Sequence, residues 1–194
     1  PTNHPARIML LFHCRSGFEA DCAAELTSIA HTARACGRAD YRHGAAYVLW
    51  VDTQAVEGKR GEWTPEYAEL VFARQVLTHC RRVDVPDVST RVAAAKRLGR
   101  RFSTVWLEAP DADRPRRLLS GLRGLEAPLQ AALTESGVLG DRRGSRLHVC
   151  FLERDEIVLG ASRPGHSSPW PMGIPRLRFP AGAPSRSGLK LVEA

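Results

Sequence analysis

Histidine and cysteine are the residues of this sequence best suited to hold a metal ion, but their spacing gives no recognisable ligand set. The seven histidines show no HxxxH or HxH pairing, and the five cysteines contain no CxxC. Zinc sites usually draw on such closely spaced ligands. The adjacent residues His13 and Cys14 lie in an apolar run typical of a strand, where neighbours point to opposite faces. The pattern predicts no metal site, and cysteines without a disulfide framework indicate a reducing compartment, the cytoplasm.

Patterns for nucleophilic, acid–base and phosphate chemistry are also incomplete. The sequence has neither GxGxxG nor GxxxxGK[ST], and the GxxG at 121–124 is too common a pattern to assign a function. Asp111 and Asp113 suit the cap of a following helix better than a catalytic pair. Three histidines lie in predicted strands and are expected to be hydrogen-bonded structural residues, namely His13, His79 and His148. Spacing alone therefore shows no complete catalytic apparatus.

The positive charge of the chain is unevenly distributed. The formal net charge is +7, residues 1–85 are balanced, and all the excess lies in residues 86–194. Nearly every cationic side chain is arginine, whose guanidinium pairs with phosphate through two hydrogen bonds and stacks on bases, as an RNA-binding surface requires. A GC-rich genome that favours arginine codons would give the same composition, so both explanations stay open. The candidate phosphate contacts are the densest arginine groups: Arg100, Arg101, Arg116, Arg117, Arg142, Arg143, Arg146, Arg176 and Arg178.

The elements that must position these side chains follow from hydropathy patterns and turn residues. The first half predicts the order β-α-β-β-α-β of a ferredoxin-like sheet. Its expected strands are 7–14, 33–42, 45–51 and 72–83, with helices at 18–29 and from Pro65. The second half predicts another compact α/β module, with helices at 86–99, 117–125 and 128–136, a strand at 102–109, and a hairpin formed by 146–152 and 157–161. No apolar run approaches the roughly 18 residues of a membrane span.

The tail after Arg163 is rich in proline, which excludes regular helix or central strand. It also carries large apolar side chains, including Trp170, Met172 and Phe179, which need a surface to cover them. We expect that surface to belong to a domain beyond this chain, and Trp170 to anchor the tail rather than stack on a base. An amphipathic helix begins near Ser187 just before the sequence stops, which indicates a fragment of a longer protein.

The tail resembles the linker and catalytic-domain entry of the RlmM-type enzymes, bacterial 23S ribosomal RNA cytidine 2′-O-ribose methyltransferases. The resemblance lies in SSPWPMGIPRLRFPAGAPSRSGLKLVEA (167–194), with support from CRSGFEADCAAELT (14–27), LVFARQ (70–75) and, more weakly, GVLGD (137–141). It implies an α+β fold with three parts: a ferredoxin-like subdomain at 1–85, a THUMP RNA-binding module at 86–163, and at 164–194 an extended Pro-rich linker that enters a methyltransferase domain.

The resemblance also implies roles for two residues of the SRSGLKL motif. Ser187 matches a serine associated with the methyl donor, S-adenosyl-L-methionine, and Lys190 matches the first lysine of a catalytic Lys-Asp-Lys-Glu set. Without the resemblance, these residues would be a helix cap and a surface lysine.

The implied function is to bind 23S rRNA and position it for a Rossmann-like methyltransferase domain of the same protein, in the cytoplasm and without metal or membrane. The fragment alone is expected to be inactive and not to bind the donor. The alternative is a protein-interaction module that docks its apolar tail on a partner chain and binds no RNA.

Overall fold

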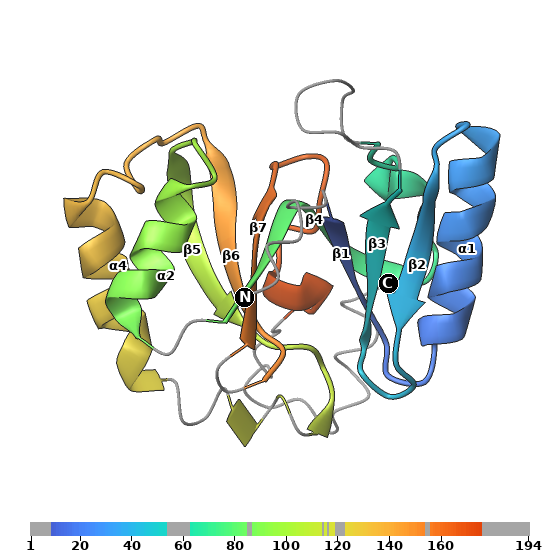
Figure 1. Cartoon of the computed structure of the whole chain (residues 1–194), viewed down its shortest axis with the longest axis horizontal. Coiled ribbons are helices and arrows are strands. Elements are labelled where there is room, and N and C mark those ends of the chain that lie inside the picture. Colours follow the sequence, from blue (N-terminus) through green and yellow to red (C-terminus); the bar gives the residue numbers. More distant parts are fainter. Residues whose placement is uncertain are drawn as a thin grey trace, which may run out of the picture.

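In the part of the chain that the structure describes, seven strands and three helices form an α+β fold (Figure 1). The computed structural model describes residues 9–53, 63–84, 87–113, 115, 117–118, 123–153 and 156–175. The strands are β1 (Met9–Cys14), β2 (Gly37–Tyr41), β3 (Tyr47–Asp52), β4 (Ala73–Asp84), β5 (Phe102–Glu108), β6 (Ser145–Phe151) and β7 (Glu156–Ser162). The helices are α1 (Glu19–Thr32), α2 (Val88–Lys96) and α4 (Glu126–Glu135), with 3-10 turns η1 (Tyr67–Glu69), η2 (Arg123–Leu125) and η3 (Pro171–Gly173).

The first half confirms the predicted ferredoxin-like sheet. Its strands run in the order β2-β3-β1-β4, and each neighbouring pair is antiparallel. The apolar face of α1, with Cys22 and Leu26 fully buried, packs on Leu10 and Phe12 of β1. In place of the short helix predicted from Pro65, the chain forms only the 3-10 turn η1.

A side chain of α1 explains why no longer helix forms there. The carboxylate of Glu25 accepts hydrogen bonds from the backbone N–H groups of Val71 and Phe72, at 2.7 and 3.2 Å. The N–H groups at the end of this connection are therefore satisfied by a carboxylate instead of by helix carbonyls.

The second half packs helices α2 and α4 on one face of β5, β6 and β7, around a core that includes Phe102, Leu133 and Leu147. Asp87 caps α2 by accepting a hydrogen bond from the Thr90 N–H. The predicted break at Pro128 is wrong. Pro128 lies in the first turn of α4, where its missing N–H has no helix partner to lose, so η2 runs directly into the helix.

The two halves share one continuous sheet, in the order β2-β3-β1-β4-β7-β6-β5. The long strand β4 joins them, because its first half pairs with β1 and its second half pairs with β7. The register shifts between Thr78 and Arg81, where His79 has a positive φ of 53°. Figure 1 shows α1 on the right, beside β2, and α2 with α4 on the left, beside β5. The proposed boundary near residue 85 follows a strand that belongs to both halves, and it stays a prediction.

Residues 163–175, called the linker segment from here on, dock on this chain's own sheet. Ser167, Ser168 and Met172 are buried, and the Trp170 side chain is 43% exposed. Figure 1 shows η3, drawn in red, near the centre of the molecule between the two halves. The expectation that Met172 would face water without a further domain is therefore wrong. Phe179 and the rest of the tail lie outside the described residues. No helix of the described part of the chain is long and apolar enough to cross a membrane.

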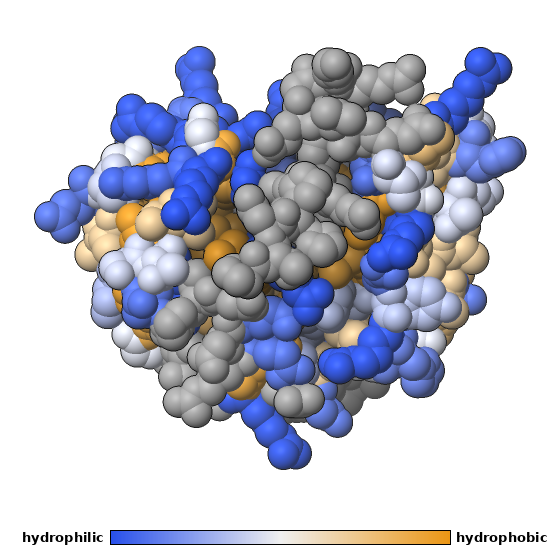
Figure 2. Space-filling model, in the orientation of Figure 1, coloured by the Kyte–Doolittle hydropathy of each residue, from blue (hydrophilic) through white to orange (hydrophobic). Residues whose placement is uncertain are grey.

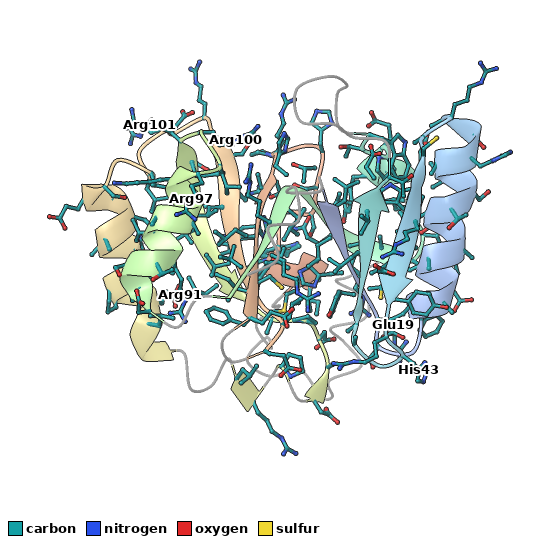
Figure 3. All side chains as sticks on the ribbon, in the orientation of Figure 1. Glu19, His43, Arg91, Arg97, Arg100 and Arg101 are labelled. Atoms are coloured by element: carbon teal, nitrogen blue, oxygen red, sulfur yellow. The ribbon has the colours of Figure 1, made fainter. Side chains whose placement is uncertain are left out.

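Glu19 ties the loop before α1 to the turn between β2 and β3. Its buried carboxylate accepts hydrogen bonds from the backbone N–H groups of Ala46, at 2.7 Å, and Gly17, at 3.1 Å. Burial alone would raise the pKa of Glu19, but these hydrogen bonds outweigh it and hold the pKa below its usual value. The side chain is therefore a charged acceptor for two loops (Figure 3).

We expect Glu19→Ala to lower the free energy of unfolding by about 2 kcal/mol, since it leaves the Ala46 N–H buried without an acceptor. Asp21→Ala is the matched control: it removes an exposed acidic residue from the same first turn, which costs about 0.3–1 kcal/mol through the helix dipole. Urea unfolding of both variants measures the difference, and equal losses would show that Glu19 acts only through its charge.

Candidate functional site

Exposed arginines gather at the end of the sheet where β5 and β6 begin. Phe102 pairs with Ser145, and β5 is parallel to β6, so the residues that precede the two strands lie at the same end. Figure 3 shows three of these arginines near the end of α2 and the start of β5, and Figure 2 shows hydrophilic side chains projecting from this part of the surface. We call the exposed set the arginine cluster: Arg97, Arg100, Arg101, Arg142 and Arg143.

Backbone hydrogen bonds hold the two arginine-bearing loops together. The N–H groups of Gly140 and Asp141 both donate to the carbonyl of Phe102, at 3.0 and 3.2 Å. Gly140 has a φ of 127°, and a Cβ there would lie 2.8 Å from the Arg101 guanidinium, so Arg101 lies across the glycine. Arg101, Arg142 and Arg143 thus lie on two loops that are fixed to each other.

The positive potential of the cluster extends toward β4. Burial and then the charge of Arg100 lower the pKa of His79 below its usual value, because both disfavour the protonated ring. His79 therefore adds no charge to this end of the sheet at neutral pH.

Apart from Arg146, the predicted phosphate contacts divide into three groups. Arg100, Arg101, Arg142 and Arg143 are brought together, and Arg97, which sequence reasoning missed, joins them from the end of α2. Arg117 is exposed but follows the opposite end of β5. The last group lies outside the described residues: Arg116, Arg176, Arg178, and with them Ser187 and Lys190.

Arg146 has an internal role. Its guanidinium lies over the Trp106 ring, 4.8 Å from the centroid, and donates to the Ser168 carbonyl at 3.1 Å. Burial lowers the pKa of Arg146 relative to a free guanidinium. These contacts attach the linker segment to β6, so the structure favours a structural role for Arg146 over the phosphate contact expected from its neighbours in sequence.

A row of buried polar side chains crosses the face of the sheet opposite the helices. Glu108 Oε1 lies 2.8 Å from His148 Nδ1, and His148 Nε2 lies 2.7 Å from Ser162 Oγ. The order serine–histidine–carboxylate is that of a hydrolase triad. All three side chains are at most 1% exposed, and neither described cavity is lined by any of them. A substrate has no access to Ser162, and the row is structural, as the sequence predicted for His148.

Glu108 is the centre of this row. Besides His148, its carboxylate contacts His13 Nε2 at 3.2 Å and accepts the Met172 N–H at 3.0 Å. Burial would raise the pKa of Glu108, but His148 and His13 outweigh it and hold the pKa well below the usual range. One ionised carboxylate thus connects β1, β5, β6 and the linker segment.

His13, Glu108 and Cys150 also place a nitrogen, an oxygen and a sulfur within 4.8 Å of one another. These donor types suit a cation such as zinc. Burial and the charge of Glu108 raise the pKa of the Cys150 thiol, however, and the thiolate is the ligand form. The expectation of no metal stays a prediction.

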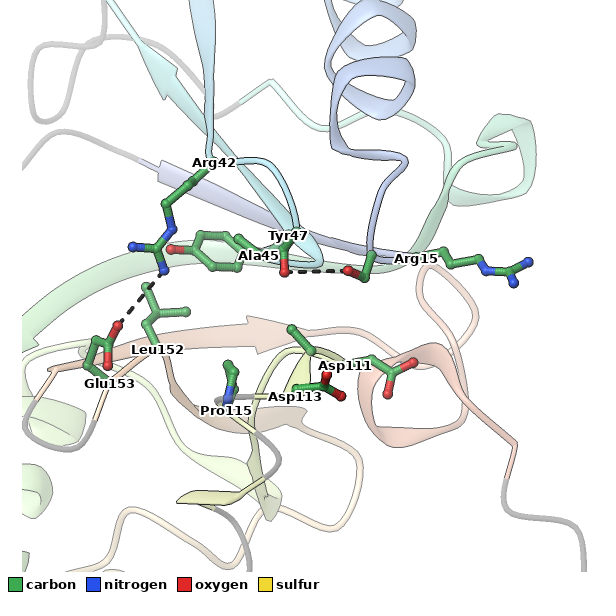
Figure 4. A pocket seen from close by; sticks show the side chains of 12 residues that line it. Arg15, Arg42, Ala45, Tyr47, Asp111, Asp113, Pro115, Leu152 and Glu153 are labelled. Carbon is green, nitrogen blue, oxygen red and sulfur yellow. Dashed lines mark hydrogen bonds and ion pairs between the residues drawn. The ribbon is translucent and has the colours of Figure 1, made fainter.

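The larger of two described cavities, about 430 Å³, lies between the β2–β3 turn and the loops that follow β5 and β6 (Figure 4). Two ion pairs involve residues that line it: Arg42 lies 3.9 Å from Glu153, and Asp111 lies 3.5 Å from Arg74. The guanidinium of Arg15 points away from the cavity and lies over the Phe18 ring. The cavity therefore does not extend the positive surface.

Two family descriptions match the chain, one after the other. "RlmM ferredoxin-like domain" matches residues 8–77, and "Ribosomal RNA large subunit methyltransferase M, N-terminal" matches residues 87–163. Curated relatives named "Ribosomal RNA large subunit methyltransferase M" come from Xanthomonas oryzae pv. oryzae (strain PXO99A) and Xanthomonas campestris pv. campestris (strain B100). Each is 40% identical over 192 residues, which is 95% of this chain and 54% of the relative. The chain thus spans about half the length of these relatives.

Solved structures show a weaker likeness. PH1313 from Pyrococcus horikoshii Ot3 has a TM-score of 0.46 and 9% identity, covering 80% of this chain and 54% of the other. SMU.472, described as a putative methyltransferase complexed with SAH, has a TM-score of 0.46 and 10% identity, covering 84% and 43%. Likeness at this level carries no inference about function.

Proposed function

We propose, because this chain belongs to the RlmM family of ribosomal RNA large subunit methyltransferases, that it is the RNA-binding N-terminal part of a 23S rRNA cytidine 2′-O-ribose methyltransferase. The observation that carries the proposal is the succession of two domains of this family over residues 8–77 and 87–163. The full-length enzyme would act in the cytoplasm and use S-adenosyl-L-methionine, held in part by Ser187, with Lys190 as a catalytic residue. Both residues belong to the tail outside the described range.

Three parts of the chain would have different roles. Residues 1–85 form the ferredoxin-like subdomain, residues 86–163 the THUMP module that contacts RNA, and residues 164–194 the linker and the entry to the catalytic domain. The arginine cluster supports this division, because all five of its members lie in the second part. Exposed guanidinium groups on loops that are fixed to each other can pair with backbone phosphates without reading bases. The chain would therefore position RNA, and the specificity of methylation would come from the complete enzyme.

The alternative, a protein-interaction module that docks its tail on a partner, loses part of its support. It was based on apolar tail residues that needed a covering surface. Met172 is covered by this chain's own sheet, and Ser167 and Ser168 are buried with it.

We expect the chain to bind structured RNA with a Kd that rises steeply with salt. If the arginine cluster neutralises about four to six phosphates, a plot of the logarithm of the association constant against the logarithm of the salt concentration has a slope near −3 to −5. The double variant Arg100→Ala with Arg101→Ala should reduce the size of the slope by about 1–2. Fluorescence polarisation with a labelled 23S rRNA fragment measures the slope.

The double variant Arg38→Ala with Arg42→Ala is the matched control. It removes two exposed arginines from β2 and the turn that follows, outside the arginine cluster. Equal slopes for the two double variants would show that RNA does not bind at the cluster, and a wild-type slope near zero would contradict RNA binding altogether.

A further inference from the structure

We propose that Gln75 and Glu108 are positioning residues, which lock the linker segment on the sheet so that the chain leaves this half of the molecule in one fixed direction. The inference rests on the proposed function, because the direction matters only if a catalytic domain follows the linker segment. It adds a role for two side chains that are completely buried.

The side-chain amide of Gln75 on β4 makes three hydrogen bonds to the linker segment. Its Nε2 donates to the carbonyls of Ser168 and Trp170, at 3.2 and 3.1 Å, and its Oε1 accepts the Ser168 N–H at 3.1 Å. The Gln75 side chain is completely buried. These three bonds satisfy backbone groups of an extended segment as a neighbouring strand would, and so fix its register.

Glu108 fixes the segment at a second point. Its Oε2 accepts the Met172 N–H at 3.0 Å, while its Oε1 faces His13 and His148. The carboxylate is itself held in place from β1 and β6, so it cannot follow the segment if the segment shifts. Hydrogen bonds to a charged acceptor are about twice as strong as neutral ones.

The backbone between these two points and the exit of the chain allows little freedom. Met172 has a φ of 58°, which is unusual for a residue other than glycine and persists only where its surroundings determine it. The next residue, Gly173, has a φ of 69°, and a Cβ there would overlap the Arg74 carbonyl of β4. Only glycine lets the turn approach β4 so closely.

Polar anchors of this kind fix the direction of the linker segment more than they stabilise the fold. Apolar side chains could hold the segment to the sheet at no desolvation cost, but they would not fix its register. After Gly173 the chain continues through Ile174 and Pro175, both half-buried, toward the remainder of the enzyme. A shift of about 1 Å in the placement of reacting groups can cost about 100-fold in rate. A fixed exit direction would therefore help to hold the catalytic domain at the ribose of an RNA that is bound to this half of the protein.

The test uses the full-length protein with two variants that act on opposite sides of the contact. Gln75→Leu removes the anchor from the sheet side, and Gly173→Ala disturbs it from the linker side without changing a strand. Thr78→Val is the matched control, since Thr78 lies on β4 and donates to Ala161 instead of to the linker segment. Hydrogen exchange of the peptide that contains Ser168 and Met172 measures docking, and methyl transfer to unmodified 23S rRNA measures kcat.

We expect both variants to speed amide exchange at Ser168 and Met172 about 100-fold and to lower kcat at least about 10-fold. The RNA Kd and the KM for S-adenosyl-L-methionine should stay within about twofold, and Thr78→Val should change none of these values. If the role were merely structural, both variants would lower the melting temperature. Their kcat, measured well below that temperature, would be unchanged.

The remaining outcomes separate the two proposals. Faster exchange with unchanged kcat would overturn the positioning role and leave the proposed function intact. Unchanged exchange in both variants would overturn the docking contact itself. A wild-type enzyme that binds RNA but transfers no methyl group would instead overturn the proposed function.

Discussion

Replacing Lys190 by alanine in the full-length protein is expected to lower kcat about 100-fold or more, while RNA affinity hardly changes. A ribose 2′-hydroxyl is a weak nucleophile, and nearby positive charge favours its alkoxide and orients it toward the donor methyl. Lys190 is assigned this role by the SRSGLKL motif, in which it matches the first lysine of the catalytic set. Its effect should fall on kcat because the ammonium acts mainly in the transition state.

Two comparisons make this result specific. Ser187→Ala should act mainly on the KM for S-adenosyl-L-methionine and more mildly on kcat. The chain that ends at Ala194 should neither transfer methyl groups nor bind the donor, because one lysine needs its partner residues within a few ångströms. Transfer of tritiated methyl groups to rRNA measures the activity of Lys190→Ala, of Ser187→Ala and of the chain that ends at Ala194. If Lys190→Ala keeps wild-type turnover, Lys190 is a surface lysine.

Local patterns were enough to predict most elements of the fold but not how they join. The hydropathy patterns of residues 7–14 and 18–29 predicted β1 and α1 correctly, since both signals are short-range. The pairing of β4 with β7 joins Thr78 to Ala161, far apart in sequence, and no periodicity in either strand indicates its partner. The single sheet was therefore not predictable from these patterns.

The candidate site shows the same division. The pairs Arg100–Arg101 and Arg142–Arg143 were evident as dense charge, and the parallel pairing of β5 with β6 brings them together. Arg146 was assigned to the same group because it is near in sequence, but it lies on a strand and stacks on Trp106. The anchors of the linker segment were missed, because Gln75 and Glu108 meet it only in the folded chain.

Glu108→Gln is expected to lower the free energy of unfolding of this chain by about 3 kcal/mol at pH 7, the largest loss among the variants considered for stability. The substitution keeps the shape of the side chain, so no cavity contributes to the loss. It leaves three donors, on His13, His148 and Met172, to share one carbonyl oxygen in a buried site. Urea unfolding measures the change.

Ser162→Ala is the matched control, because it removes the neutral end of the same row and should cost only about 1 kcal/mol.

The loss from Glu108→Gln should also depend on pH. The folded state holds the pKa of Glu108 below its value in the unfolded chain, near 4.3, so the stabilisation is fully present above that pH. It is lost as the pH falls toward the folded pKa, and the difference between wild type and Glu108→Gln should narrow below about pH 4. A loss no larger than that of Ser162→Ala, or one that does not change with pH, would show that charge on Glu108 does not hold the two halves and the linker segment together.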